Sequence, residues 1–117
     1  MKRALAAVVV PVFALGLSAC GSNSKTETFD VNAVSLNGKS AFSVGTITAT
    51  EGDKVVLRVG NLTDKDHGFS IDALNVHRVV KPRESQQVTF TPSKTGQFTI
   101  YCQLHPTHVP SQLVVVG

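Results

Sequence analysis

A segment near the end of the chain, residues 101–108, reads Tyr-Cys-Gln-Leu-His-Pro-Thr-His and groups one thiol with two imidazoles. The thiol is Cys102 and the imidazoles are His105 and His108. A third imidazole, His67, stands upstream at the start of another strand-like run. A thiolate and neutral imidazoles are the ligands that soft or borderline metals such as copper and zinc bind. These side chains therefore predict one metal site, provided that the fold brings His67 to the later segment.

Short strands are the elements that would position these side chains. Apolar residues alternate with polar ones in short runs, turn residues such as Asn37-Gly38 separate the runs, and no window has a convincing helical period. The expected strands cover 29–36, 42–50, 54–59, 68–74, 86–91, 96–102 and 112–116. Short strands at this spacing indicate an all-β protein, a sandwich or a barrel, with about seven to eight strands.

Strand alternation also predicts which way two of the candidate ligands face. Cys102 falls on the same face of its run as Phe98 and Ile100, so the thiol is expected to point toward the core. By the same count His67 shares a face with the apolar residues of the run that it begins. A large polar side chain is not buried without a partner. Both side chains are therefore expected to point inward, at the ends of their strands, toward a shared ligand.

Residues 1–19 are predicted to be a lipoprotein signal peptide. Lys2 and Arg3 precede an apolar run, 4–17, that is shorter than the roughly 20 residues needed to cross a bilayer. The run ends in Leu-Ser-Ala-Cys, which resembles the bacterial lipobox and implies cleavage before Cys20 and lipid attachment to it. The alternative is an ordinary signal peptide in which this cysteine is incidental.

Lipidation would place the protein on the extracytoplasmic face of the cell membrane, with residues 20–28 as the lipidated cysteine and a flexible tether. Cys102 would then be the one remaining thiol in a compartment where disulfides normally form. Such a thiol forms an intermolecular bridge, is reactive, or binds a metal. The formal charge of +3 includes Lys2 and Arg3, and no basic run remains that would indicate nucleic-acid binding.

The segment from about 42 to 117 resembles the cupredoxins, the small copper-binding β-sandwiches. The resemblance rests on motifs in the family's order: Glu-Gly-Asp-Lys-Val-Val at 51–56, Asp-His-Gly-Phe-Ser-Ile at 66–71, Thr-Gly-Gln-Phe-Thr-Ile-Tyr-Cys at 95–102, and the ligand loop and last strand that follow. The most similar branch is the single-domain type, including that fused in bacterial iron-uptake lipoproteins. The resemblance implies a Greek-key sandwich over residues 29–117 and one copper ion. It also implies His67, Cys102 and His105 as ligands.

The family often has a weak axial methionine, and His108 occupies the position where the short-loop version places it. Met1 is the only methionine and lies in the expected signal peptide. Because an imidazole donates more strongly than a thioether, axial His108 predicts a lower potential and a red or green site. Gln112 as the axial donor and a three-coordinate site remain alternatives. A dinuclear centre of the cytochrome oxidase type is excluded, because it needs two cysteines in this loop.

The expected function is electron transfer by a monomer with a redox partner protein, and not enzymatic catalysis. Apolar residues around His105 would form the docking patch: Leu104, Pro106, Val109 and Pro110. One alternative is copper handling as a chaperone, buffer or resistance protein with a copper-transfer partner, and another is a red-copper site that binds nitric oxide. Zinc also suits one cysteine with three histidines. His77 matches no ligand position and is expected at a solvated strand end or in a loop.

Overall fold

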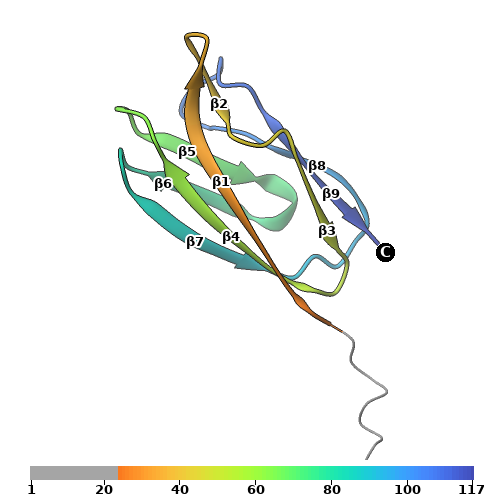
Figure 1. Ribbon diagram of the computed structural model, residues 1–117. Helices are drawn as coiled ribbons and strands as arrows, with labels where there is room; N and C mark the ends of the chain where they lie inside the picture. The colour runs from red at the N-terminus through yellow and green to blue at the C-terminus, as the bar shows by residue number, and fades with distance from the viewer. Residues whose placement is uncertain (1–23) are drawn as a thin grey trace, which may run out of the picture.

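The computed structural model describes residues 24–117, which form two β-sheets and a separate hairpin (Figure 1). Every regular element in this range is a β-strand apart from one short 3₁₀ turn, η2. The elements are β1 (Thr26–Leu36), β2 (Lys39–Phe42), β3 (Thr46–Thr50), β4 (Lys54–Asn61), β5 (His67–Ile71), η2 (Asp72–Leu74), β6 (Val76–Val80), β7 (Ser85–Phe90), β8 (Gly96–Ile100) and β9 (Ser111–Val116).

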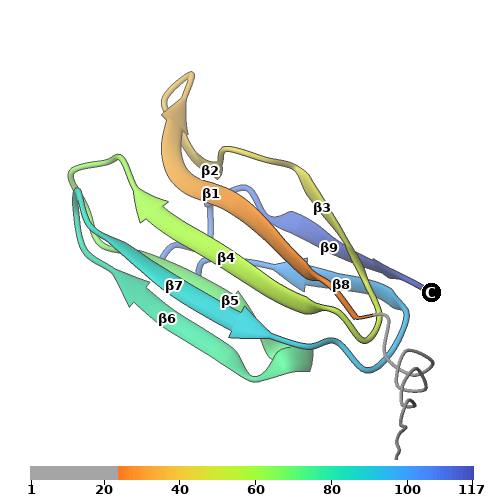
Figure 2. The same ribbon diagram turned by 60° about the horizontal axis from the view of Figure 1, so that its bottom comes forward.

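The two sheets have the strand orders β2-β1-β4-β7 and β3-β9-β8. The pairs β1–β4 and β3–β9 are parallel and the other neighbours are antiparallel. The chain passes from the first sheet to the second between β2 and β3, so strands adjacent in sequence are often separated in space. The β5–β6 hairpin lies along one side of the sandwich, between the edge strands of the two sheets. There β5 contacts β8 and β6 contacts β7 (Figure 2). This arrangement confirms the expected all-β Greek-key sandwich.

One apolar core fills the space between the sheets. Alternate residues of β4 and β9 point into it, as the period of a half-buried strand requires. The core includes Val31, Ile47, Ala49, Val55, Leu57, Val59, Phe69, Ile71, Val88, Ile100, Leu113 and Val115. β5 differs because all five of its residues are buried. The strand that begins with His67 is therefore held on both faces.

Two strands depart from the expected runs. β6 was not predicted, because only its end residues Val76 and Val80 are buried and its middle shows no apolar alternation. It is a strand because it pairs with β5 along its whole length. The expected run 42–50 divides in two, since Gly45 and its neighbours carry the chain from one sheet to the other. The described range therefore has nine strands rather than the expected seven or eight.

The first strand begins at Thr26, before the expected domain start at Phe29. Its parallel pairing with β4 begins at the Thr26–Lys54 pair, and the Lys25 N–H donates to Asp53 Oδ1 at 3.0 Å. The predicted signal peptide 1–19 and the lipidation site Cys20 lie outside the described residues. Within residues 24–117, no helix is long and apolar enough to cross a membrane.

Candidate metal centre

His67 is the first residue of β5, and its side chain is almost fully buried. The loop before it is fixed by Asn61, a buried residue at the end of β4. The Asn61 amide donates to the carbonyls of Lys65 at 2.6 Å and Val80 at 2.9 Å, and its Oδ1 accepts the Thr63 N–H and hydroxyl. All the polar groups of Asn61 thus have partners, and together they set the direction in which the chain enters β5.

Cys102 reaches the same place from β8. Between the strand and the thiol, Tyr101 and Ser70 exchange two backbone hydrogen bonds, at 2.8 and 3.0 Å, which tie this segment to β5. The pairing places the Cys102 sulfur next to the start of β5, where it accepts the Gly68 N–H at 3.1 Å. The thiol is 5% exposed. Strand alternation therefore predicted its inward direction correctly.

His105 comes to the thiol through two successive turns. The His105 N–H donates to the Cys102 carbonyl at 3.4 Å, and the His108 N–H donates to the His105 carbonyl at 3.0 Å. The turns fold the loop back over the end of the sandwich. A spacing of three residues therefore suffices to face the imidazole toward the sulfur.

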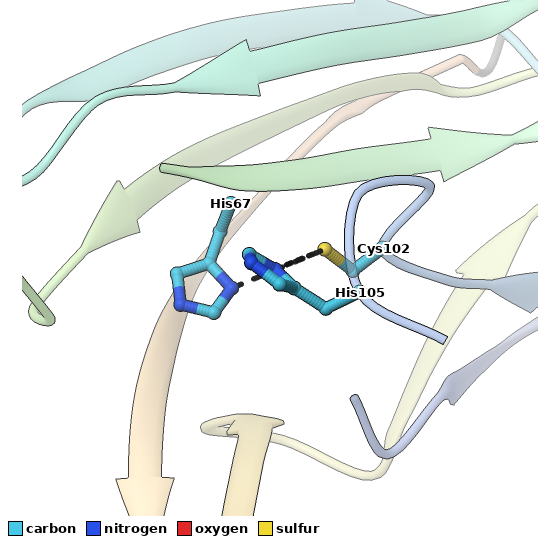
Figure 3. Close-up of side chains that lie close together, drawn as sticks. All are labelled: His67, Cys102 and His105. Atoms are coloured by element: carbon cyan, nitrogen blue, oxygen red, sulfur yellow. Dashed lines mark hydrogen bonds between the residues drawn. The ribbon is translucent and has the colours of Figure 1, made fainter. Parts of the chain in front are cut away.

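The side chains of His67, Cys102 and His105 point toward one another (Figure 3). The sulfur lies 3.9 Å from His67 Nδ1 and 3.5 Å from His105 Nδ1, and the three donor atoms all lie within 4.8 Å of one another. Bonds of about 2.3 Å to sulfur and about 2.0 Å to nitrogen, as at zinc, place the sulfur about 3.5–3.7 Å from each nitrogen in a tetrahedral or trigonal site. The two sulfur–nitrogen distances are therefore close to those around one metal ion.

His108 lies beside this group and leaves one nitrogen free. Its Nδ1 is 3.0 Å from the Val109 carbonyl, which accepts but cannot donate, so Nδ1 carries the proton and Nε2 the lone pair. Nε2 is the one buried side-chain nitrogen or oxygen in residues 24–117 without a hydrogen-bond partner. The ring centroid is 5.1 Å from that of His67 and 4.3 Å from that of Phe42. His108 stands outside the cluster whose donor atoms all lie within 4.8 Å of one another, but its buried lone pair and its place beside the His67 ring suit a weaker, more distant ligand. Its Nδ1–H is bound to a carbonyl, as in many metal-binding histidines.

Gln112, the alternative axial donor, is not brought to the group. It lies on β9 between Ser111 and Leu113, which are both buried. Successive side chains of a strand point to opposite faces, so Gln112 points away from the core side that holds Cys102. Of the two candidate axial side chains, only His108 lies near the other donors.

Burial and mutual repulsion lower the pKa values of two of the imidazoles. Burial is the largest cause of the lowered pKa of His67, and positive charge on His108, His105 and Lys65 acts in the same direction, against the smaller effect of Asp66. Burial also lowers the pKa of His108, although its hydrogen bond to the Val109 carbonyl opposes the shift. Both rings are therefore neutral at neutral pH, which is the form that binds metals.

These shifts predict that the metal-free protein loses stability in mild acid. A histidine whose pKa is lower in the folded state binds protons first in the unfolded state, so its contribution is complete above about pH 6.5 and is lost as the pH falls. The free energy of unfolding in urea should therefore be lower at about pH 5.5 than at about pH 7.5. In the His108→Gln variant the difference should shrink, because glutamine does not titrate. An equal difference in both proteins would contradict the assignment to this ring.

A ring of polar contacts holds the two residues that flank the thiol. After it, the Gln103 amide oxygen accepts the Ser70 hydroxyl at 2.7 Å, and Ser70 Oγ is 3.1 Å from His77 Nδ1. Before it, the Tyr101 hydroxyl donates to Asp72 Oδ1 at 2.7 Å, and this oxygen is 3.7 Å from His77 Nε2. The contacts therefore run from one neighbour of the thiol to the other.

Sequence reasoning missed the roles of Ser70, Gln103 and His77 in this ring. His77 is on β6 and half-exposed, so it lies near solvent as expected. It also contacts Ser70 and Asp72, which hold the two neighbours of Cys102. The signal that would have found it is the hairpin register, which places His77 directly opposite Ser70. That register was hidden because β6 itself was not predicted.

Gly68 has no side chain, which allows the ligand loop at Gln103 to approach β5 closely. A methyl group added at Gly68 should therefore disturb the metal site. A Cβ at Gly68 would lie 2.9 Å from the backbone nitrogen of Gln103, closer than real Cβ contacts. Gly68→Ala should therefore push the loop from β5, weaken the Gly68 N–H contact with the Cys102 sulfur, and lower the affinity for the metal by about 10–100-fold. A competition titration with a metal chelator measures this loss. Gly45→Ala is the matched control, since a Cβ there meets nothing within 4 Å; equal affinities for both variants would refute the explanation.

The comparison with protein families decides the identity of this fold and site. The family model described as "Cupredoxin-like domain" matches residues 5–115. The chain belongs to this family. The resemblance inferred from the sequence motifs is thereby confirmed, as is the cofactor, a single copper ion. His67, Cys102 and His105 form a cluster of side chains that could hold it.

Known proteins resemble this cupredoxin in two ways. The nitrous-oxide reductases of Cupriavidus necator and Ralstonia nicotianae are 42% and 35% identical to it over 65 residues, which are 53% of this chain. The chain spans about a tenth of the length of these curated relatives. Among solved structures, auracyanin A, a blue copper protein of Chloroflexus aurantiacus, matches with a TM-score of 0.64 and 17% identity, over 78% of this chain and 99% of its own. A copper-binding protein in the apo form matches with a TM-score of 0.61 and 14% identity, over 82% and 93%. At these identities the structural matches show the fold alone.

Proposed function

We propose that this cupredoxin transfers electrons as a mononuclear copper protein on the extracytoplasmic face of the cell membrane. The observation that carries the proposal is the buried Cys102 sulfur with His67 and His105 nitrogens at 3.5–3.9 Å. Copper in a His₂Cys site cycles between Cu(I) and Cu(II) and so gains or loses one electron. The lipobox-like Leu-Ser-Ala-Cys sequence supports export and anchoring through Cys20.

The protein contributes a rigid frame for the ligands. His67 enters from a loop fixed by Asn61, and Cys102 is held between residues tied to β5. Donors that cannot move keep one geometry in both oxidation states, which keeps the structural change on electron transfer small. Support from two separate strands therefore suits a carrier that must gain and lose an electron quickly.

His105 provides the route by which electrons reach the surface. It is only partly buried, whereas His67 and Cys102 are 2% and 5% exposed. Around it lies the predicted apolar patch, formed by Leu104, Pro106, Val109 and Pro110. All four are exposed, Leu104 by 42% and Val109 by 44%. An exposed apolar patch beside the outermost ligand supports brief contact with a redox partner protein.

The copper-loaded full-length protein tests this function by voltammetry. A reversible one-electron wave, with the copper still bound after repeated cycles, is the expected result. If reduction instead releases copper to a Cu(I) acceptor protein, the protein handles copper and electron transfer is not its function. Stopped-flow mixing with a redox reagent measures the exchange rate independently.

We infer further that the domain does not itself catalyse a reaction. His108 Nε2 is buried without a hydrogen-bond partner, and the His108 ring lies 5.1 Å from the His67 ring between centroids, which supports a fourth protein ligand where a substrate would otherwise bind. The relatives named nitrous-oxide reductase are about ten times the length of the matched segment. The similarity therefore supports redox chemistry in this chain but does not assign the relatives' activity to it. Addition of nitric oxide should leave the optical and EPR spectra of the Cu(II) protein unchanged. A new spectrum would show an open copper position and favour a small-molecule site.

A further inference from the structure

Two hollows meet beside the metal centre and form one groove. A hollow of about 340 Å³ reaches His67, and another of about 370 Å³ reaches His105. Both are bordered by Gly38, Ser40 and Lys65, so we name them together the histidine groove. The groove connects the surroundings of two metal-binding imidazoles with the tip of the β1–β2 hairpin. It is therefore a surface that a partner reaching the copper would touch.

Unpaired positive charge borders this groove. Lys39, Lys65 and Arg83 line it, with Asp64 as the acidic side chain among the lining residues. Arg83 is paired with Asp64 at 2.9 Å, so these two charges largely cancel. Within residues 24–117 neither lysine ammonium forms an ion pair. The net charge that the groove presents therefore comes from two lysines, one of them shared by both hollows.

The acidic neighbour of His67 does not cancel this charge. Asp66 is exposed but borders neither hollow. The ligand end of the sandwich thus combines an apolar patch around His105 with a basic groove beside it. Such a combination suits a partner that brings both apolar contact and negative charge.

We propose that the histidine groove receives an acidic surface of the redox partner, with Lys39 and Lys65 facing its carboxylates. The proposal rests on the electron-transfer function and adds the chemistry of the partner. The lysines attract the acidic surface from a distance, and the apolar patch then makes the short-lived contact through which the electron passes. Charge complementarity of this kind mainly raises the association rate, by 10-fold or more at low salt.

Two small oxidants of opposite charge test the proposal on the copper-loaded full-length protein. Hexacyanoferrate(III) represents an anionic partner and tris(phenanthroline)cobalt(III) a cationic one; each takes one electron from Cu(I), with no bond or proton exchanged. The rate with hexacyanoferrate should fall steeply from about 0.01 M to about 1 M salt, as the Debye length shortens from about 30 Å to about 3 Å. In the Lys39→Glu, Lys65→Glu double variant this rate should drop about tenfold at low salt, and the rate with the cobalt complex should rise.

The matched control is the double variant Lys54→Glu, Lys94→Glu. It changes the net charge equally, but Lys54 is the first residue of β4 and Lys94 precedes β8. The starts of both strands lie at the end of the sandwich away from the start of β5 and the ligand loop (Figure 1). At about 0.01 M salt the rate of this control with hexacyanoferrate should fall less than that of the groove variant. At about 0.1 M salt, where the Debye length is about 10 Å, its rates should stay within about twofold of the original protein, since exposed charges beyond a Debye length are screened. Equal losses in both double variants, or no loss in either, would overturn the groove proposal while leaving electron transfer intact. If the protein exchanges electrons with neither oxidant, the result instead contradicts the proposed electron-transfer function, and the groove proposal fails with it.

Discussion

Replacing Cys102 by serine should abolish the intense visible absorption of the copper-loaded protein and weaken Cu(I) binding by at least about 100-fold. The absorption requires a thiolate bound to Cu(II), and a serine hydroxyl does not become the soft anionic ligand that Cu(I) prefers. Loss of a residue that merely supports a ligand costs about 10–100-fold in metal affinity, so loss of the thiolate itself costs at least the upper figure. Optical spectroscopy and a competition titration with a Cu(I) chelator measure the two effects.

The chain provides its own control for this experiment. Cys20 is the other cysteine, and Cys20→Ser should leave the absorption and the affinity unchanged. The copper-free Cys102→Ser protein should still fold, since serine is smaller than cysteine and its oxygen also accepts the Gly68 N–H that now reaches sulfur at 3.1 Å. Circular dichroism of both copper-free variants checks this point. Visible thiolate absorption that survives in Cys102→Ser would refute the site.

The sequence contained enough information to predict which segments bring the three donor residues together. In the ligand loop the signal is local, because two successive turns place His105 against Cys102 at short sequence spacing. For His67 the signal was weaker, since it depended on the strand-like pattern and on the family motif around it. The structure adds the reason that His67 approaches: Tyr101 pairs with Ser70, which ties the start of β5 to the loop.

Contacts that depend on tertiary pairing could not be predicted. β6 carries exposed polar residues between its buried ends, and pairing with β5 makes it a strand, so the contact of His77 with Ser70 stayed hidden. Likewise, the first residues of β1 are polar, and their pairing with β4 extends the strand to Thr26. The histidine groove could not be predicted either. Lys39 comes from the β1–β2 hairpin and Lys65 from the loop between β4 and β5, and they come together only in the folded sandwich.

Replacing His108 by methionine should raise the reduction potential of the copper by more than about 60 mV, which is tenfold in the one-electron equilibrium. A thioether donates less strongly than an imidazole, so it stabilises Cu(II) less and shifts the balance toward Cu(I). The absorption should shift toward that of a blue site. Methionine is apolar and flexible enough to occupy the space of the buried ring against Phe42. Voltammetry measures the potential, and Leu104→Met, an exposed change in the same loop, is the control.

The same substitution should have the opposite effect on stability in the copper-free protein. His108 Nε2 is buried without a hydrogen-bond partner, and an unsatisfied buried polar group costs about 1–3 kcal/mol. Methionine removes this cost, so the copper-free variant should unfold at a higher urea concentration than the original protein. A nitrogen that destabilises the copper-free fold is well explained if copper binds it. Unchanged potential together with raised stability would instead show that His108 only packs against Phe42 and that the copper has three protein ligands.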